Sequence, residues 1–275
     1  MGELVVVVAP PGATVQDAGR AGWLHAGIPP SGPLDATAHA AANLAVGNDP
    51  RAAALEIPLG PLHVRIVGDV NVSVDGETPM DMRDGELVVP SSERAVRYLA
   101  VHGGVDVPVV LGSRATLVAA GFGGFRGRTL RAGDVLQVGP STLARVSGAI
   151  PTVSDPPDPA VLSVRAGPHM ARFPDGALSR FLDTVWRIST RGDRVGVRLD
   201  EGTVPRLGDD RAPPAPMVRG AVQITTDGTP IVLGPDHPVT GGYPVIAVVG
   251  RASQAVLARL RAKRRLRFAL ADDGA

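Results

Sequence analysis

Frequent glycine and proline divide this chain into short apolar segments, and this feature limits its fold more than any other. The 275 residues include 34 glycines and 26 prolines. Apolar and polar side chains alternate in residues 62–66 and 70–74, which is the period expected for antiparallel strands with one buried face. Short strands separated by turns predict a mainly β fold, either a barrel or a sandwich.

Turn and capping residues locate the individual elements. Asp75-Gly76 predicts a tight turn, and Asp227-Gly228 predicts a hairpin between two short apolar runs. Only a few short helices are expected, and Asp35 is a favourable N-cap for the first of them. Further strands are expected at residues 3–8, 97–103, 107–112, 134–139, 162–167, 185–190 and 243–250, and helices at residues 35–48, 175–185 and 253–263.

One segment has the composition of a linker. Residues 147–160 are rich in proline and contain few large apolar side chains. We therefore predict two domains, residues 1–155 and residues 156–275. The hydrophobic content of 44% is ample for a buried core in a chain of this length.

The composition excludes several kinds of chemistry. The chain has no cysteine, and so it can form neither a disulfide nor a thiolate nucleophile. Lys263 is the only lysine, so the lysines of a P-loop and of a serine amidase are missing. For the same reason we expect no covalent biotin on this chain. The six histidines lack ligand-like spacing, and no metal site is expected within the chain.

The overall charge argues against two classes of partner. The formal net charge is +1 and only 3% of the residues are aromatic, so neither nucleic acid nor a membrane surface is expected to bind. The apolar run near the N-terminus is too short for a signal peptide or a membrane span. The expected location is the cytoplasm.

A long polar loop follows the first strands. It reads VQDAGRAGWLHAGIPPSGPLD over residues 15–35. Loops longer than about 12–15 residues inside a compact domain are usually functional or disordered. Because Trp23, Leu24 and Ile28 can anchor this one, we expect it to be ordered.

An ordered loop can hold polar groups at fixed positions, which makes Gln16, Asp17 and Arg20 candidates for a functional site. A structural explanation stays open for each of them, since Asp17 and Arg20 could form an ion pair within the loop. As a hypothesis, Arg20→Ala abolishes activity with little effect on thermal stability.

Four blocks of the sequence resemble a known family. They are TVQDAGRAGWLHAGIPPSGPLD with the following ANLAVGNDPRAAALEIPLG, then YLAVHGGVDVPVVLGSRAT, GDRVGVRL and GAVQITTDGTPIVLGPDHPVTGGYPVIAVV. Together they are similar to the family that contains the C-type 5-oxoprolinase subunit and KipA, also called allophanate hydrolase subunit 2 or biotin-dependent carboxyltransferase. Several ordered blocks over nearly the whole chain are far more specific than one short motif.

The resemblance implies a fold and partners. It implies two cyclophilin-like β-barrel domains, in agreement with the strand pattern. It also implies a KipI-like partner subunit and, in a 5-oxoprolinase, a LamB/YcsF-like subunit. A small amide is the implied substrate, and ATP and magnesium are expected at the level of the complex.

Three functions are compatible with this resemblance. In the first, the chain is a subunit of an ATP-dependent hydrolase that opens 5-oxoproline to glutamate and is inactive without its partners. In the second, it is a KipA-type regulator that sequesters a KipI-like inhibitor of a histidine kinase. In the third, it is the carboxyltransferase part of a biotin-dependent system similar to urea carboxylase. The first function is favoured.

Candidate site residues follow from the matching blocks. Carboxylates serve as base or magnesium ligand, and arginines, amides and glycine-rich turns bind anions. The resemblance therefore points to Asp17, Arg20, Glu56 and Asp236 as catalytic residues, and to Gln16, Ser31, Gly32, Arg194, Arg198, Gln223, Thr240, Gly241, Gly242 and Tyr243 as substrate-binding or anion-binding residues.

Some positions depart from the family pattern. Pro214 and Pro216 replace a serine and a glycine, and His237 replaces a usual arginine. Val195 and Val197 stand where methionine and tyrosine are common. The fold assignment is unaffected, but these substitutions place the substrate and the activity in question and favour the regulatory alternative.

Overall fold

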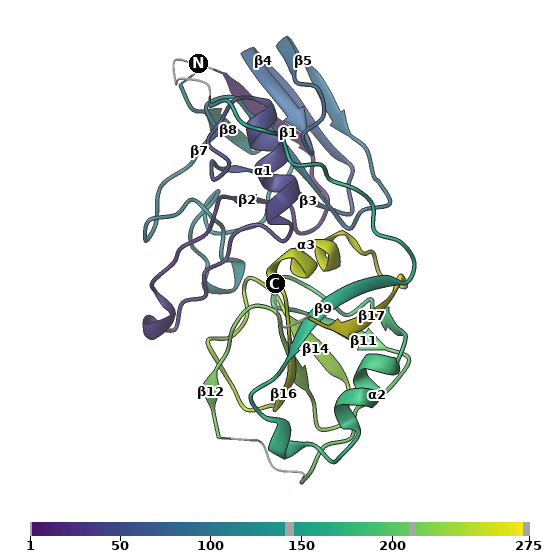
Figure 1. Ribbon diagram of the computed structural model, residues 1–275. Helices are drawn as coiled ribbons and strands as arrows, with labels where there is room; N and C mark the ends of the chain where they lie inside the picture. The colour runs from purple at the N-terminus through teal and green to yellow at the C-terminus, as the bar shows by residue number, and fades with distance from the viewer. Residues whose placement is uncertain (1, 141–145, 209–212, 272–275) are drawn as a thin grey trace. The chain divides into compact units, whose positions relative to one another are not determined.

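The computed structural model describes residues 2–140, 146–208 and 213–271. It is mainly β, which confirms the predicted fold class, and the described residues include three α-helices (Figure 1). The chain divides into two compact units. Unit 1 comprises Met1–Ala21 and Ser31–Ser154, and unit 2 comprises Gly22–Pro30 and Asp155–Ala275.

Unit 1 is built on one antiparallel sheet. Its strands follow the order β2-β3-β6-β4-β1-β8-β7, and β5 pairs with β4 outside this path. The strands are β1 (Glu3–Val8), β2 (Thr14–Gln16), β3 (Ala54–Pro58), β4 (Leu62–Val74), β5 (Met80–Val89), β6 (Val96–Val101), β7 (Val105–Asp106) and β8 (Val135–Val138).

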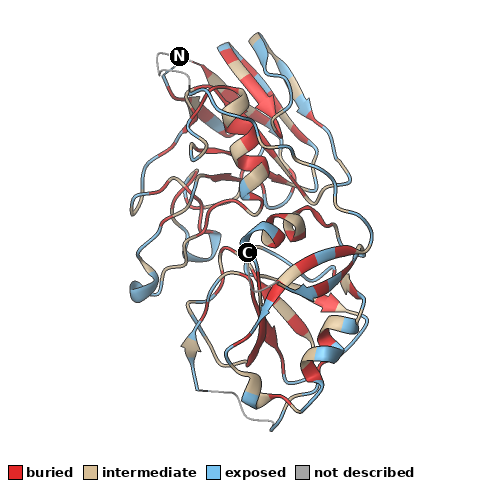
Figure 2. Ribbon diagram, in the orientation of Figure 1, coloured by how far each residue is buried: buried red, intermediate tan, exposed pale blue. Residues whose placement is uncertain are grey.

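Strand β4 explains how the sequence pattern forms the core of unit 1. Leu62, Val64 and Ile66 are buried, whereas Arg65 between them is exposed, and the buried residues of β4 are visible in Figure 2. Each such apolar side chain contributes about 1.5–3 kcal/mol when it is fully buried. Residues 62–66 and 70–74 form a single strand, because the register with β5 shifts at a bulge between Ile66 and Asp69.

The predicted cap and turn of unit 1 are confirmed. Asp35 caps α1 (Ala36–Ala45), since its Oδ1 accepts hydrogen bonds from the backbone N–H groups of the next turn. Asp75 and Gly76 both have positive φ, as the tight turn after β4 requires. A Cβ on Gly76 would lie 2.8 Å from Cβ of Ala41. Small residues are therefore needed where the turn meets the helix.

Unit 2 contains a closed barrel in the order β10-β11-β14-β13-β16-β9-β17. All pairs are antiparallel except β9 with β17. The elements are β9 (Ala160–Ala166), α2 (Ala177–Asp183), β10 (Trp186–Ile188), β11 (Gly196–Asp200), β13 (Ala221–Ile224), β14 (Pro230–Leu233), β16 (Val245–Val249), α3 (Arg251–Arg259) and β17 (Arg265–Leu270). A separate pair joins β12 (Ala215–Pro216) to β15 (Thr240–Gly241).

Aromatic side chains stabilise the core of unit 2. The rings of Phe181 and Phe268 stack with centroids 4.4 Å apart. Trp186 is fully buried, and its indole N–H donates to the Phe181 carbonyl at 2.9 Å. Burial of such large rings accounts for much of the apolar surface that the barrel removes from water.

The strand predicted at residues 107–112 is wrong. Strand β7 ends at Asp106, and only an isolated bridge between Val110 and Ser113 follows. Pro108 has no N–H group to continue the ladder, so the chain turns away from the sheet.

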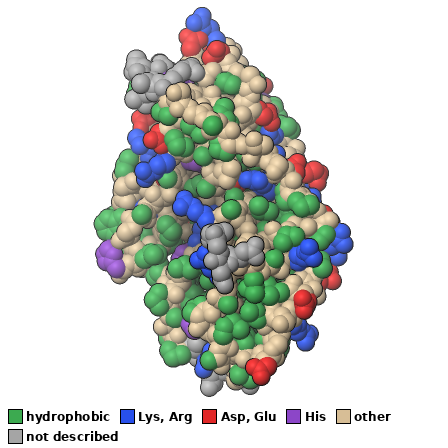
Figure 3. Space-filling model, in the orientation of Figure 1, with side chains coloured by type: hydrophobic (Ala, Val, Ile, Leu, Met, Phe, Trp, Pro, Cys, Tyr) green, Lys and Arg blue, Asp and Glu red, His purple; other side chains and the backbone are tan. Residues whose placement is uncertain are grey.

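Charge and hydropathy describe the rest of the surface. Acidic and basic side chains are interspersed on the face shown in Figure 3, as is usual for a surface without one dominant charge. In the described part of the chain, no helix is long and apolar enough to cross a membrane. The short 3-10 helices lie at Leu24–Ala26, Val118–Ala120 and Met170–Arg172.

Candidate functional site

A cavity of about 520 Å³ lies on the outer face of the barrel in unit 2. Arg198, Ile231 and Gln223 stand side by side on β11, β14 and β13 and line it. The neighbouring register positions Val222 and Val232 belong to the barrel core, and because side chains alternate along a strand, the first three point outward. The remaining lining residues are Thr190, Arg191, Gly192, Asp193, Val195, Gly196, Leu233, Pro238 and Tyr243.

Arg198 is the principal charged group on the cavity floor. Its side chain is half-buried, and no described residue forms an ion pair or a hydrogen bond with its guanidinium group. A guanidinium group that is partly removed from water and has no protein partner favours an anionic ligand, since it can donate two parallel hydrogen bonds to a carboxylate.

Gln223 supplies an amide to the same cavity. The side chain is 5% exposed, and its Nε2 donates to Met217 Sδ at 3.3 Å and to the Tyr243 carbonyl at 3.5 Å. Its Oε1 accepts no hydrogen bond from a described residue. The fixed Nε2 therefore orients an acceptor oxygen that a ligand N–H group can reach.

The loop with TGGYP holds this amide in place. Thr240 and Gly241 pair with Pro216 and Ala215. A Cβ on Gly241 would lie 2.5 Å from Gln223 Nε2, so only glycine permits this approach. Neither Gly241 nor Gly242 has a positive φ. Glycine at position 241 is needed for close packing rather than for a left-handed backbone, and of this loop Pro238 and Tyr243 line the cavity.

Arg194 and Asp236 are engaged with each other beside the cavity. The guanidinium donates to both carboxylate oxygens, at 2.8 and 3.2 Å. The side chains are 14% and 6% exposed, so the pair is partly removed from water. This bidentate pair joins two loops of unit 2, and neither residue lines the cavity.

In unit 1, Asp17 and Arg20 tie the polar loop to residues 113–123. Asp17 accepts hydrogen bonds from the Ser113 hydroxyl and the Arg114 N–H, both at 2.5 Å. Arg20 is 2% exposed, donates to the Ala115 carbonyl, and lies 4.9 Å from the ring centroid of Phe122. They do not pair with each other; both stabilise the loop through other segments.

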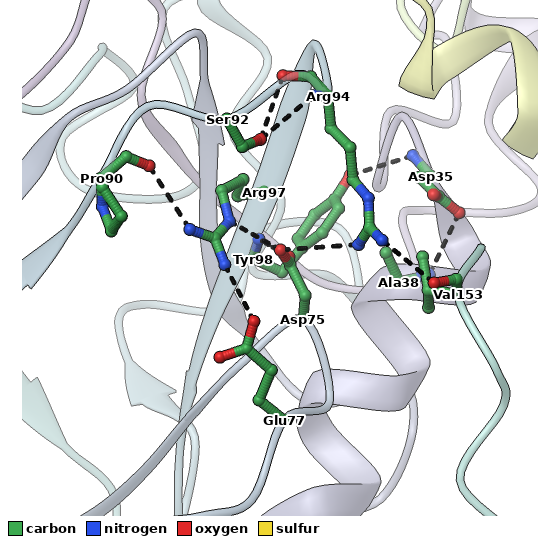
Figure 4. Close-up of polar contacts among 10 residues, drawn as sticks. All are labelled: Asp35, Ala38, Asp75, Glu77, Pro90, Ser92, Arg94, Arg97, Tyr98 and Val153. Atoms are coloured by element: carbon green, nitrogen blue, oxygen red, sulfur yellow. Dashed lines mark hydrogen bonds and ion pairs between the residues drawn. The ribbon is translucent and has the colours of Figure 1, made fainter. Parts of the chain in front are cut away.

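Glu56 forms a buried pair with Tyr98, a residue that the sequence did not indicate. Glu56 Oε2 accepts from the Tyr98 hydroxyl and from the Leu34 N–H, both at 2.7 Å. The Tyr98 oxygen in turn accepts from the Asp35 N–H at 2.9 Å (Figure 4). Burial raises the pKa of the Tyr98 hydroxyl well above its usual value, and the charge of Glu56 raises it further.

Figure 4 also shows why Tyr98 stays in place. Asp75 accepts a hydrogen bond from the Tyr98 N–H at 2.7 Å and binds Arg97 Nε at 2.7 Å. Arg94 lies on the other side of the same carboxylate, at 3.8 Å. The turn after β4 therefore fixes the strand that carries Tyr98.

Two polar atoms in unit 1 are buried without a hydrogen-bond partner among the described residues: Gln16 Oε1 and Ser31 Oγ. The Gln16 Nε2 donates to Thr14 Oγ1 and to the Thr116 carbonyl. Ser31 has φ 55°, and Gly32 lies so close to Ala18 that its Cβ would be 3.1 Å from the carbonyl oxygen. Buried polar atoms of this kind commonly mark a bound water or ligand group.

The predicted site residues thus fall into two groups. Arg198, Gln223 and Tyr243 line the cavity of unit 2, and Thr240, Gly241, Gly242, Arg194 and Asp236 support its surroundings. Gln16, Asp17, Arg20, Ser31, Gly32 and Glu56 belong to unit 1. Of the expected loop anchors, Trp23 is half-buried but Leu24 is 46% exposed. Sequence reasoning missed Arg191, although it directly precedes the GDRVGVRL block.

Comparisons with known proteins agree on one family. The carboxyltransferase domain family, subdomain A and B, matches residues 26–270. The C-type 5-oxoprolinase subunit of Escherichia coli is 36% identical over 263 residues, which cover 90% of this chain and 84% of that protein. Lachancea kluyveri urea amidolyase is 31% identical over 89% of this chain, but the match spans only 16% of the amidolyase.

A solved structure extends the similarity to the fold. The K. lactis urea amidolyase superposes on 98% of this chain with a TM-score of 0.89 and 27% sequence identity. The superposed part is 19% of that longer chain. Both units therefore have counterparts in a protein of known structure.

Proposed function

The chain belongs to the carboxyltransferase domain family, subdomain A and B, and from this membership we propose that it is a subunit of a 5-oxoprolinase-type hydrolase that opens 5-oxoproline to glutamate. The similarity to the Escherichia coli protein, which extends over most of both chains, supports this proposal. A subunit of such an enzyme acts with partner subunits, and we propose a KipI-like and a LamB/YcsF-like protein in these roles, in the cytoplasm.

The observation that carries the proposal is the pairing of Arg198 with Gln223 across one cavity. 5-Oxoproline is a small lactam ring that bears a carboxylate. Arg198 offers two N–H donors to the carboxylate, and Gln223 Oε1 offers an acceptor to the lactam N–H. Ile231 lies between the two residues and supplies an apolar surface for the ring.

The spacing of the strands suits a ligand of this size. Neighbouring strands lie about 4.8 Å apart, so residues two strands apart are separated by roughly twice that distance. The cavity of about 520 Å³ leaves room beside the ring for a second group. Arg191 at its edge forms only a long contact with Asp200, at 3.9 Å, and its side chain is 70% exposed. We propose that it faces this second group.

ATP, when bound in the complex, would supply the phosphoryl group that activates the lactam carbonyl before water opens the ring. The carboxylates of this chain offer little to its magnesium ion. Among the described residues, no group of three or more histidine, aspartate or glutamate side chains gathers to hold a metal. Asp17, Glu56 and Asp236 already accept hydrogen bonds within the chain. We therefore propose that partner subunits supply the base and the magnesium ligands.

The test is release of glutamate from 5-oxoproline by the chain purified with its partner subunits, with and without ATP. ATP-dependent release that is lost in Arg198→Gln would support the proposal. A stable complex that releases no glutamate would reject it.

A second function, carboxyl transfer to urea, is favoured by the similarity to urea amidolyase. Urea has no carboxylate, so this function gives Arg198 no partner of that kind. Adding a separate biotin carrier, bicarbonate and ATP to the complex, and measuring urea-dependent consumption of ATP, distinguishes the two. Urea dependence without glutamate release would establish the carboxyltransferase.

A further inference from the structure

Strand β7 leaves the sheet of unit 1 abruptly. Val105 and Asp106 pair with Val138 and Gln137 of β8. In this register the next hydrogen-bonded pair would join Pro108 to Val135, since hydrogen-bonded and non-hydrogen-bonded pairs alternate. Proline has no N–H group to donate, and no hydrogen bond joins these two residues in the described chain. Half of β8 is therefore left with one free edge.

The backbone of Val135 faces that free edge. The Val138 N–H donates to the Gly2 carbonyl on the β1 side, at 2.9 Å. Because successive residues of a strand point their N–H and C=O groups to opposite sides, those of Val135 point away from β1. The Val135 side chain is 41% exposed, as expected at an open edge.

A cavity of about 460 Å³ occupies the gap. Val107, Pro108 and Val110 line one wall, and Val135 and Leu136 line the other. The glycine-rich segment 121–127 closes the end, with Phe122 and Phe125 among the lining residues. We call this gap the β8 slot. It combines an open strand edge with apolar walls, which are the two features that a protein needs to bind an extended segment by strand addition.

The charges around the β8 slot favour an acidic ligand. Asp106 is paired with Arg114 at 3.2 Å, and Asp134 is paired with Arg128 at 2.7 Å. Arg126 at the lip is exposed and stacks 5.2 Å from the Phe125 ring centroid. It forms no ion pair with any described residue, so its positive charge remains available to a ligand in the slot.

We propose that the β8 slot binds an extended segment of a partner subunit, which adds one strand to β8 at Val135 and places an acidic side chain against Arg126. This inference rests on the proposed function, because it assigns a docking surface to the partner which that function requires. The occupant is a protein segment rather than a small molecule, since its main contacts are with backbone groups in strand geometry.

The experiment uses the complex of the full chain with its partner subunits. Amide hydrogen exchange at Val135 should slow at least tenfold when the complex forms. Arg126→Glu should weaken the affinity for the partner at least about tenfold, because it sets like charges against each other. The charge-matched control Arg131→Glu lies outside the slot and should leave the affinity unchanged.

Proline at position 135 gives a second test. Val135→Pro removes the outward N–H that an added strand would use, whereas Val135→Thr keeps it. The proline variant should weaken partner binding about fivefold relative to the threonine variant, with both variants first shown to be folded by thermal unfolding.

The outcomes separate this inference from the proposed function. A complex that forms with unchanged exchange at Val135 and tolerates Arg126→Glu would overturn the docking surface alone. The same would follow if 5-oxoproline or ATP, rather than the partner, protected Val135. Failure of the wild-type chain to form any complex would overturn the subunit role together with the docking surface.

Discussion

Arg198 and Gln223 face one cavity from strands β11 and β13, with Ile231 of β14 between them. The barrel sets this relationship, because each of the three residues occupies an outward register position. A cation and an amide acceptor at fixed separation can recognise a ligand by two groups at once. That ability distinguishes a carboxylated lactam from a simple anion and from a neutral amide.

Replacing Arg198 by glutamine should remove the carboxylate contact. Loss of one partner of a partly buried charge pair costs about 2–5 kcal/mol, so the Kd for 5-oxoproline should rise at least about 30-fold. The free energy of unfolding should change by less than about 0.5 kcal/mol, because no described residue pairs with Arg198. Calorimetric titration and thermal unfolding measure the two quantities.

Arg267→Gln is the matched control for this variant, since Arg267 is exposed on β17 and does not line the cavity. It should leave both binding and stability unchanged. If Arg198→Gln bound 5-oxoproline as well as the wild type, the carboxylate would have to bind elsewhere.

Gly241→Ala tests whether the Gln223 amide must stay where it is. The added methyl group would lie 2.5 Å from Gln223 Nε2, so the amide has to move. Overpacking of this kind costs about 1–3 kcal/mol of stability, and loss of one hydrogen bond should weaken 5-oxoproline binding about fivefold. Gly192→Ala at the same cavity meets its nearest neighbour at 3.5 Å and should bind normally. Equal affinities in the two variants would remove Gln223 from the site.

Arg20 illustrates how burial changes an expectation drawn from sequence. The side chain is 2% exposed and its loss would leave the Ala115 carbonyl without this donor. An unsatisfied buried group costs about 1–3 kcal/mol and a lost contact with the Phe122 ring about 0.5–2 kcal/mol. Arg20→Ala should therefore lower the free energy of unfolding by roughly 2–4 kcal/mol. This replaces the hypothesis that the variant keeps its stability.

Denaturant unfolding of Arg20→Ala and of Arg126→Ala provides the comparison. Arg126 also lies against an aromatic ring but is exposed, so its loss should cost less than about 1 kcal/mol. Wild-type stability in Arg20→Ala, combined with lost activity of the complex, would restore the functional interpretation of this arginine.

Local patterns were sufficient to predict much of the fold. Alternating side chains located β4, and Asp35 located the start of α1, because both signals depend on neighbouring residues. The absence of a strand at residues 107–112 was missed. Its apolar composition is typical of a strand, whereas the outcome depended on Pro108 reaching a position where β8 needs a donor.

The site was less accessible from sequence for the same reason. The family blocks indicated Arg198, Gln223 and Tyr243, but the shared cavity exists only once strand register is known. Arg194 and Asp236 are 42 residues apart in sequence, and no local pattern shows that they pair. Tyr98 carries no motif of its own, and its importance becomes visible only beside the buried Glu56.

The pair of Glu56 and Tyr98 predicts how stability changes at alkaline pH. The Tyr98 pKa is raised above its unfolded value of about 10, so above that pH the folded state retains a proton that the unfolded state has lost. Stability is therefore fully present below about pH 10 and declines as pH rises, by up to about 1.36 kcal/mol per pH unit. Tyr98→Phe should flatten this slope, although its stability at neutral pH should be lower because Glu56 loses a donor. Tyr243→Phe changes the other tyrosine of the chain and should keep the wild-type slope in denaturant unfolding between pH 8 and about 11. Identical slopes in all three proteins would show that Tyr98 does not control alkaline unfolding.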